Sequence, residues 1–206
     1  MAGRLKVRSG PQEKTWRRML REAGGRVRDN VFLRDLAISS IDPAYHRQIE
    51  IVVTGLPFAH GLPVAVDATM LSVLHADGSP WAGAETKPGS SFGRAYRDKF
   101  RTYPELKDSD TVRLVVAGAE VGGRMTRESL DLLDAAANSR SQLDPPVLRR
   151  QAARAWRARW LAMLAVSAQD TLAATLIRRA LAWWTRRREQ RPRRPRCGSM
   201  ASSEAG

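Results

Sequence analysis

The sequence predicts an α/β fold in which a mixed sheet is flanked by helices and followed by a carboxy-terminal helical extension. One helical pattern precedes three strand patterns, and helix, strand and helix patterns then follow in turn. The chain of 206 residues suits one core with extensions, because domains usually hold about 100–200 residues. We expect a disordered basic tail at 1–13, a core at 14–145, a helical extension at 146–187 and a disordered Arg-rich tail at 188–206.

The first expected helix covers residues 14–23. Trp16, Met19, Leu20 and Ala23 recur at the i, i+3, i+4, i+7 spacing of one helix face, and two glycines end the pattern. A strand is expected over 27–38. Clearer alternation of apolar and other residues predicts strands over 47–53 and 64–71, and the Gly/Pro-rich connection between them favours a hairpin.

The remaining elements follow a Gly/Pro-rich loop that is expected over 76–91. We predict a helix at 92–102, a buried strand at 111–119 and a helix that opens at Thr126, which suits an N-cap. The extension is predicted to hold two helices, at 146–166 and 168–187. Aromatic residues at helical spacing, which include Tyr96, Tyr103 and the tryptophan pairs, are expected in the core.

The charge balance indicates a polyanionic partner. Lys and Arg number 35 against 21 Asp and Glu, which gives a net charge of +14 and a pI near 11.2. Such a charge favours nucleic acid as the partner, through counterion release, although an anionic membrane surface also attracts a basic chain. The most apolar stretch, 161–177, is interrupted by polar residues and no leader pattern opens the chain, so we expect a soluble, intracellular and nuclear protein. Cys197 stands alone, which excludes a disulfide framework and a Cys-based zinc site.

Two carboxylates are expected to lie opposite each other in the hairpin. If Val53 faces Val64, then Glu50 faces Asp67, because paired positions in an antiparallel hairpin keep a constant sum. Opposed like charges are unfavourable, and a divalent cation such as Mg²⁺ would offset the repulsion through hard oxygen ligands. Alternatively, one acid faces solvent or pairs with an arginine on a half-exposed sheet.

Lys99 is expected to point toward the sheet. Phe92, Tyr96, Lys99 and Tyr103 fall within an arc of about 60° at about 100° per residue, so the lysine lies on the apolar stripe of its helix. Its ammonium could orient an attacking water and stabilise charge on a scissile phosphate. The alternative is that its stem passes the aromatic rings and its ammonium reaches solvent.

Several segments together resemble the restriction-like endonuclease domain that follows the reverse transcriptase in site-specific non-LTR retrotransposons. They are WRRMLREAGGRVRDNVFLRD, HRQIEIVVTG, GLPVAVDAT, GRAYRDKFRTYPEL and RLVVAGAEVGGR, in the order of that family, and the resemblance covers most of 15–180. It implies a restriction-endonuclease-like fold and a variant of the PD-(D/E)xK site in which the lysine has moved to a helix. Glu50, Asp67 and Lys99 match its three positions.

The resemblance implies a DNA endonuclease that hydrolyses phosphodiester bonds with Mg²⁺, or with Mn²⁺, and a reverse transcriptase module as a partner in a longer parent polyprotein. Gln48, Ile49 and Glu50 depart from the usual Pro-Asp, and Thr69 stands where the ancestral pattern has a strand-borne lysine. These departures leave open a catalytically degenerate remnant that binds nucleic acid. A protein-interaction module with a basic tail is a third reading.

Other titratable residues are weaker candidates. Glu85, Thr86 and Lys87 spell ExK, but they lie in a loop pattern between Gly83 and Pro88, whereas a catalytic acid needs a rigid strand. Further weak candidates, or residues without metal-ligand spacing, are Glu22, Glu120, His46, His60 and His75.

Two groups of arginines could bind nucleic acid. The carboxy-terminal group is interrupted by a single acid and predicts a nucleic-acid-binding arm or a nuclear-localisation patch; it consists of Arg186, Arg187, Arg188, Arg191, Arg193, Arg194 and Arg196. The second group either follows phosphates or forms a solvated helix face; it consists of Arg149, Arg150, Arg154, Arg157 and Arg159.

Overall fold

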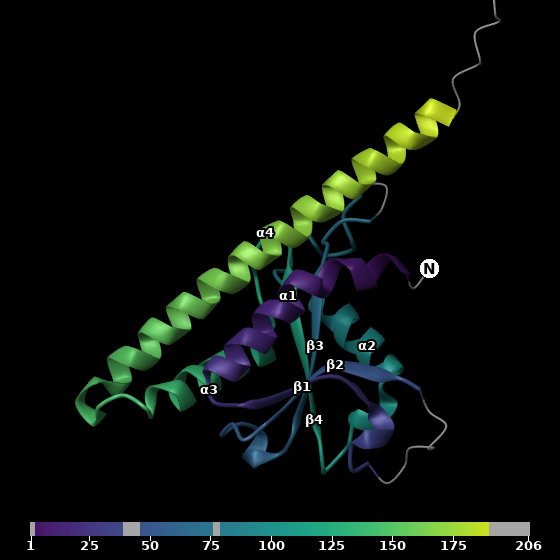
Figure 1. Cartoon of the computed structure of the whole chain (residues 1–206). Coiled ribbons are helices and arrows are strands. Elements are labelled where there is room, and N and C mark those ends of the chain that lie inside the picture. Colours follow the sequence, from purple (N-terminus) through teal and green to yellow (C-terminus); the bar gives the residue numbers. More distant parts are fainter. Residues whose placement is uncertain (1–2, 39–45, 76–78, 190–206) are drawn as a thin grey trace, which may run out of the picture.

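The computed structural model describes residues 3–38, 46–75 and 79–189, with the side chains of 3–9, 179 and 186–189 left aside. Its helices and strands follow the predicted order of helix, three strands, helix, strand and helix. They are α1 (Gly3–Glu22), β1 (Arg26–Phe32), β2 (Gln48–Thr54), β3 (Val64–Leu71), α2 (Phe92–Thr102), β4 (Arg113–Glu120), α3 (Arg127–Ser141) and α4 (Arg149–Glu189) (Figure 1).

The four strands form one mixed sheet in the order β1-β2-β3-β4. Strand β2 runs antiparallel to both β1 and β3, and β4 runs parallel to β3. Val53 pairs with Val64, so the predicted hairpin register is confirmed. The strand expected over 27–38 is shorter, because β1 ends at Phe32 and a 3₁₀ turn over Leu33–Asp35 follows.

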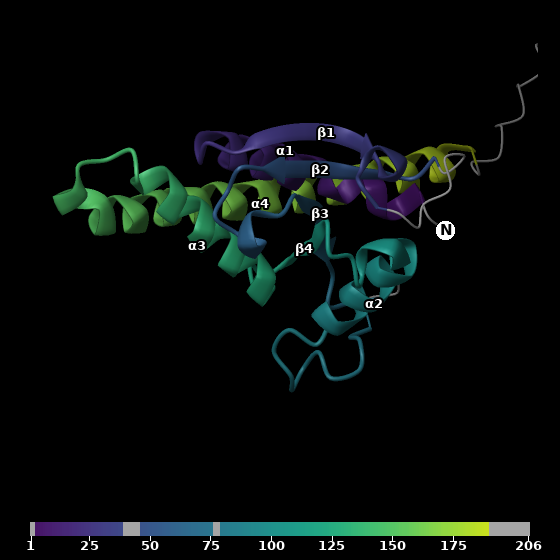
Figure 2. The same cartoon turned by 90° about the horizontal axis from the view of Figure 1, so that it is seen from below.

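The two faces of the sheet are covered unequally. Helices α1, α3 and α4 pack on one face around Trp16, Leu132 and Trp160, all of which are fully buried. The opposite face carries α2 and the segment after it (Figure 2). Side chains of β3 alternate between the two faces, so its odd-numbered positions, Asp67 among them, point toward α2.

The outer edge of β4 is covered by the start of α3. Thr126 caps α3 as predicted, because its Oγ1 accepts a hydrogen bond from the Ser129 amide. The Thr126 hydroxyl also donates to the Val116 carbonyl at 3.0 Å, the Thr126 amide donates to the Gly118 carbonyl at 2.9 Å, and the Val116 amide donates to the Glu128 carboxylate at 3.3 Å. A Cβ on Gly118 would lie 2.8 Å from the Thr126 side chain, so this approach requires glycine.

Helix α1 begins earlier than predicted. The composition of 1–13 predicts a disordered tail, whereas the helix runs from Gly3 and contains Pro11. A tertiary contact explains the extension, since Gln12 is buried and its Nε2 donates to the Leu164 carbonyl of α4 at 2.9 Å. This contact stabilises the helical conformation of a segment whose composition alone predicts a disordered tail.

Helix α4 is continuous over 41 residues, so the prediction of two helices divided near Ser167 is wrong. The hydroxyl groups near the expected division bond within the helix. Ser167 donates to the Leu164 carbonyl at 2.9 Å and Thr171 donates to the Ser167 carbonyl at 2.7 Å. Positions 188 and 189, which we assigned to the disordered tail, are helical, and positions 190–206 lie outside the described residues.

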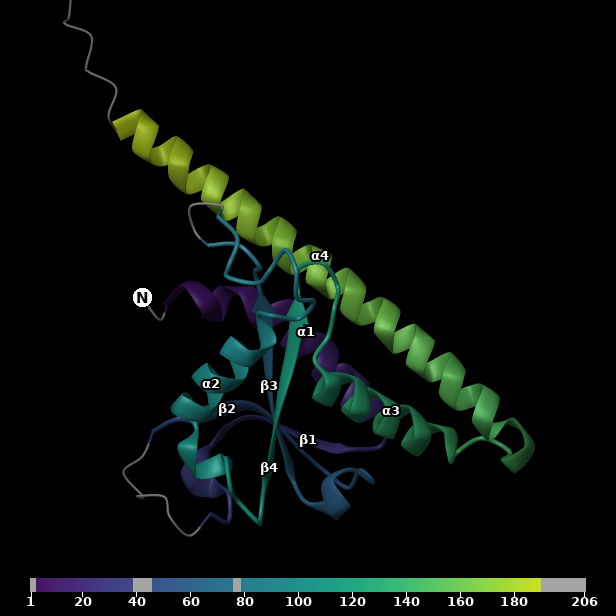
Figure 3. The same cartoon turned by 180° about the vertical axis from the view of Figure 1, so that it is seen from behind.

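The carboxy-terminal half of α4 extends past the rest of the described chain (Figure 3). It exposes apolar side chains, and Trp183 and Trp184 are 47% and 66% exposed, so the expectation that this pair belongs to the core is wrong. Trp160, by contrast, is buried. The helix over Pro146–Thr185 is long and apolar enough to cross a membrane by length and composition, a weak criterion that core helices of soluble proteins also meet.

Candidate active site

Glu50 and Asp67 lie on neighbouring strands at the point where the β2–β3 pairing ends. The last paired positions are Ile51 and Val66, and the constant sum of the register places Glu50 opposite Asp67 at the next step. The β1–β2 pairing is also interrupted there, because the pairs Asp29 with Ile51 and Val31 with Ile49 flank an unpaired position. The regular pairing of the strands is therefore interrupted at the positions of the two acids.

Lys99 of α2 forms an ion pair with Asp67 of β3. Its ammonium donates to Oδ2 of Asp67 at 2.7 Å and lies 2.6 Å from Oδ1. The Asp67 carboxylate is fully buried, whereas the Lys99 side chain keeps 25% of its surface exposed. The predicted orientation of the lysine toward the sheet is thus confirmed, because Phe92 and Tyr96 pack on the same sheet face and turn this side of α2 inward.

Glu50 is half-buried, and its carboxylate has no partner for one oxygen. Within the described residues, its Oε2 is buried and receives no hydrogen bond. Arg17 donates to the backbone carbonyl of Glu50 at 3.5 Å and forms its ion pairs with Glu13 and Asp29, so the nearby arginine does not neutralise the Glu50 side chain. Burial, and then the negative charge of Asp67, raise the pKa of Glu50 to about 7.

Burial also raises the pKa of Asp67, although the Lys99 charge opposes this change. The Tyr103 hydroxyl donates to the Gln48 carbonyl at 3.2 Å and lies near the Asp67 carboxylate, where it lowers the pKa of that acid. Burial and the two acids together raise the pKa of Tyr103, so its hydroxyl stays protonated and available as a donor. The site therefore combines two acids, one ammonium and one phenol.

Tyr103 is the polar group that sequence reasoning missed. The sequence analysis placed it in the core, and it is indeed buried. A signal was present, since Tyr103 lies four residues after Lys99 on the same stripe and such residues are neighbours on a helix surface. The contribution of Glu13, whose negative charge raises the pKa of both Glu50 and Asp67, had no comparable signal in the sequence.

A pocket of about 330 Å³ opens beside Glu50. It is lined by Asn30, His46, Arg47, Gln48, Glu50, Thr102 and Tyr103. Asn30 adopts a left-handed conformation with φ of 49°, which only glycine and short polar residues reach readily. Arg47 stands 3.6 Å from Glu105 at this pocket, so a positively charged group lies close to the acids.

The alternative acids occupy structural positions. Glu85 and Lys87 are both exposed in a turn-rich loop, away from any strand, which agrees with their rejection as an ExK element. Glu22 accepts a hydrogen bond from Trp160 Nε1 at 2.8 Å, and Glu120 accepts one from the Ser91 hydroxyl at 2.6 Å. Neither acid contacts the Asp67–Lys99 pair.

The histidines and the carboxy-terminal arginines do not join the Asp67–Lys99 pair in the part of the chain that the structure describes. His46 and His60 are exposed, and His75 stacks on Trp81 with ring centroids 3.3 Å apart. Arg186, Arg187 and Arg188 continue α4, without a described side-chain position. The other expected members of the arm, Arg191, Arg193, Arg194 and Arg196, lie outside the described residues.

The donor set fits a magnesium ion better than a softer metal. The described part of the chain has no cluster of three or more His, Cys, Asp or Glu side chains that could hold a metal. Mg²⁺ commonly uses one or two carboxylates and completes its shell with water and substrate phosphates. Glu50, with its unpartnered buried oxygen, and Asp67 supply such a pair.

Comparison with known proteins leaves the chain without an assigned family. No family model matches it, and no curated protein matches it significantly.

Proposed function

We propose that this protein is a metal-dependent DNA endonuclease with a restriction-endonuclease-like fold, derived from a retrotransposon. The observation that supports this function most directly is the buried Asp67 carboxylate held by Lys99 of α2, beside a second acid with an unpartnered oxygen. The four-stranded mixed sheet flanked by helices provides a suitable frame. The family resemblance assigns these same three residues to the site.

Each side chain has a distinct role in this proposal. Glu50 and Asp67 would hold Mg²⁺, or Mn²⁺, and the ion would supply positive charge that polarises a phosphate and activates water. Lys99 places its ammonium next to the acids and stabilises charge that develops on the scissile phosphate. Tyr103 places its hydroxyl beside the Asp67 carboxylate and is itself held by the hydrogen bond that it donates to the Gln48 carbonyl.

The proposed reaction is hydrolysis of a DNA phosphodiester, and it is tested by nicking of supercoiled plasmid with Mg²⁺ or Mn²⁺. Asp67→Asn should abolish cleavage yet preserve DNA binding in EDTA, because it removes a metal-holding charge while the positive surface remains. Lys99→Ala should slow cleavage by about two to three orders of magnitude, the usual effect of losing one preorganised donor.

Lys87→Ala is the matched control, since Lys87 is an exposed loop lysine outside the site. It should cleave at the wild-type rate. An inactive Lys87→Ala protein alongside an active Lys99→Ala protein would transfer the catalytic role to Glu85 and Lys87 and refute the site assigned above.

A catalytically degenerate nucleic-acid-binding remnant is the second candidate. The ammonium of Lys99 lies within 2.7 Å of both Asp67 oxygens, so the pair can persist as a structural ion pair. Glu50 also replaces the shorter aspartate that the family resemblance leads one to expect. A wild-type protein that binds DNA without cutting it in any divalent metal would favour this candidate.

The arginine arm supports DNA binding in either case. The proposal extends to a nuclear location and to a reverse transcriptase module in a longer parent protein. If the arm contacts about three phosphates, deletion of positions 186–206 should lower the log–log salt dependence of binding by about 2.7, at about 0.9 per phosphate. Fluorescence anisotropy at several salt concentrations measures this slope, and an unchanged slope would exclude the arm from binding.

A further inference from the structure

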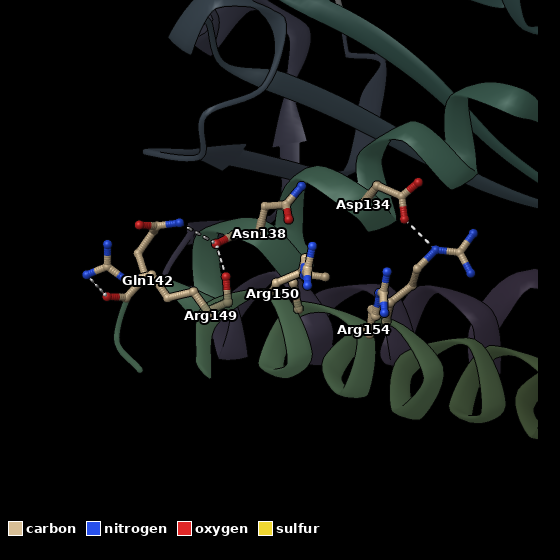
Figure 4. A pocket seen from close by; sticks show the side chains of 10 residues that line it. Asp134, Asn138, Gln142, Arg149, Arg150 and Arg154 are labelled. Atoms are coloured by element: carbon tan, nitrogen blue, oxygen red, sulfur yellow. Dashed lines mark hydrogen bonds and ion pairs between the residues drawn. The ribbon is translucent and has the colours of Figure 1, made fainter. Parts of the chain in front are cut away.

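A second basic pocket lies between α3 and the first turns of α4, on the sheet face opposite the Asp67–Lys99 pair (Figure 4). Its volume is about 450 Å³. Arg150, Arg154 and Arg157 line it from α4, and Asp134 and Asn138 of α3 line it together with Gln142, the residue after that helix. The sequence analysis left these arginines as either phosphate contacts or a solvated face.

The three arginines lie on one side of α4. Their spacing of four and then three residues keeps them on the same face, one above another. Small residues, Ala137 on α3 and Ala153 on α4, leave space between the helices. The guanidinium groups therefore gather along one groove instead of radiating from the helix.

Two of these guanidinium groups have no partner in the part of the chain that the structure describes. Arg150 and Arg154 form no hydrogen bond or ion pair there, and both are exposed. Arg157 instead pairs with Asp134, which neutralises the acid of the pocket. Neighbouring Arg149 donates to the backbone carbonyls of Asp144 and Gln142 at 3.2 and 3.3 Å. The pocket thus keeps an excess of positive charge and free donors.

We propose that this pocket binds consecutive phosphates of one strand of duplex DNA. The proposal rests on the DNA-directed function given above and adds a contact outside the cleavage site. Arg150 and Arg154 are about 6 Å apart along the helix at about 1.5 Å per residue, which is close to the separation of neighbouring phosphates along one strand. The two free guanidinium groups therefore match two consecutive phosphates, which is more than a single phosphate group needs.

The chemistry of the lining agrees with a phosphate ligand. Guanidinium forks bind phosphate oxygens through two parallel hydrogen bonds. The Asn138 side chain extends from α3 beside the arginines, where its amide can donate to a further oxygen (Figure 4). Because the pocket and the acid pair lie on opposite faces of the sheet, this contact increases affinity without entering the reaction.

The test is the double variant Arg150→Gln/Arg154→Gln, measured by fluorescence anisotropy with a labelled 20-base-pair duplex in EDTA. The log–log salt slope should fall by about 1.8, at about 0.9 per lost phosphate contact, and affinity at 150 mM salt should fall about tenfold. The melting temperature should not change, because neither side chain has a described partner.

The control Arg127→Gln/Arg178→Gln removes the same charge from exposed positions of α3 and α4 outside the pocket. Equal slopes for the two double variants would overturn the proposal. Unchanged duplex binding together with loss of thermal stabilisation by pyrophosphate would also overturn it and assign the pocket to a small phosphorylated molecule.

Cleavage separates this proposal from the proposed function. If the wild type never cuts DNA but the pocket variant loses affinity relative to its control, the pocket stands and the endonuclease fails. If the wild type cuts and the pocket variant binds as its control does, the endonuclease stands and the pocket fails.

Discussion

The two faces of the sheet differ in what they contribute: one buries most of the large apolar side chains, and the other carries the candidate site residues. The face under α1, α3 and α4 buries large apolar side chains such as Trp16 and Trp160. The face under α2 has a thinner cover and holds Asp67, Glu50 and Lys99. One face can thus tolerate buried charge because the other supplies most of the apolar burial.

Trp160→Ala should have the largest effect on stability. The side chain is fully buried and its Nε1 donates to Glu22, so truncation removes both apolar contact and a hydrogen bond. We expect a loss of about 3–5 kcal/mol in the free energy of unfolding, measured by urea denaturation. Trp184→Ala on the same helix, at a 66% exposed position, should change it by less than about 0.5 kcal/mol. Similar losses in both variants would show that the exposed part of α4 is equally important for folding.

Lys99→Met should have the next largest effect, because it leaves the buried Asp67 carboxylate without its cation. We expect about 2–3 kcal/mol of destabilisation at pH 8, somewhat below the loss for a fully buried pair, since Lys99 is partly exposed. The double variant Asp67→Asn/Lys99→Met should recover most of this loss. If Lys99→Met is as stable as the wild type, the sheet face under α2 tolerates the Asp67 carboxylate without a cation beside it.

Glu50→Gln should have a smaller effect that depends on pH. The pKa of Glu50 is about 7 in the folded protein against an ordinary value of 4.5. The folded state therefore gains stability from the protonated acid below about pH 4.5 and loses it as pH rises through 7. Glutamine cannot titrate, so in EDTA the variant should be more stable than the wild type by about 1–2 kcal/mol at pH 8, with little difference at pH 5.

Thermal unfolding at the two pH values measures the effect of Glu50, and Glu85→Gln at an exposed loop position is the control. A difference between wild type and Glu50→Gln that stays constant from pH 5 to pH 8 would contradict the raised pKa.

Local periodicity predicted much of the fold, and it also predicted that Glu50, Asp67 and Lys99 lie on the same face of the sheet. The alternation in the hairpin fixed the register that places Glu50 near Asp67, and the stripe of α2 oriented Lys99. Both features depend on residues close in sequence, for which spacing determines the facing direction. The catalytic role of these residues remains a prediction.

Long-range contacts explain what the sequence did not reveal. The early start of α1 depends on Gln12 reaching Leu164, 152 residues away. The continuity of α4 is a local matter by comparison, since the Ser167 hydroxyl bonds to a carbonyl of its own helix and composition does not decide between this bond and a break. The exposure of Trp183 depends on whether any element packs beside it, which an apolar pattern cannot show.

The covering of β4 by α3 has a consequence for self-assembly. Thr126 and Glu128 occupy hydrogen-bonding groups of Val116 and Gly118 that an incoming strand would need. Addition of a foreign strand there would first require the amino-terminal turn of α3 to open. The other outer strand, β1, carries exposed charge at Arg26, Arg28 and Asp29, which disfavours pairing with a copy of itself. The sheet thus resists growth into fibrils at one border through occupied bonds and at the other through charge.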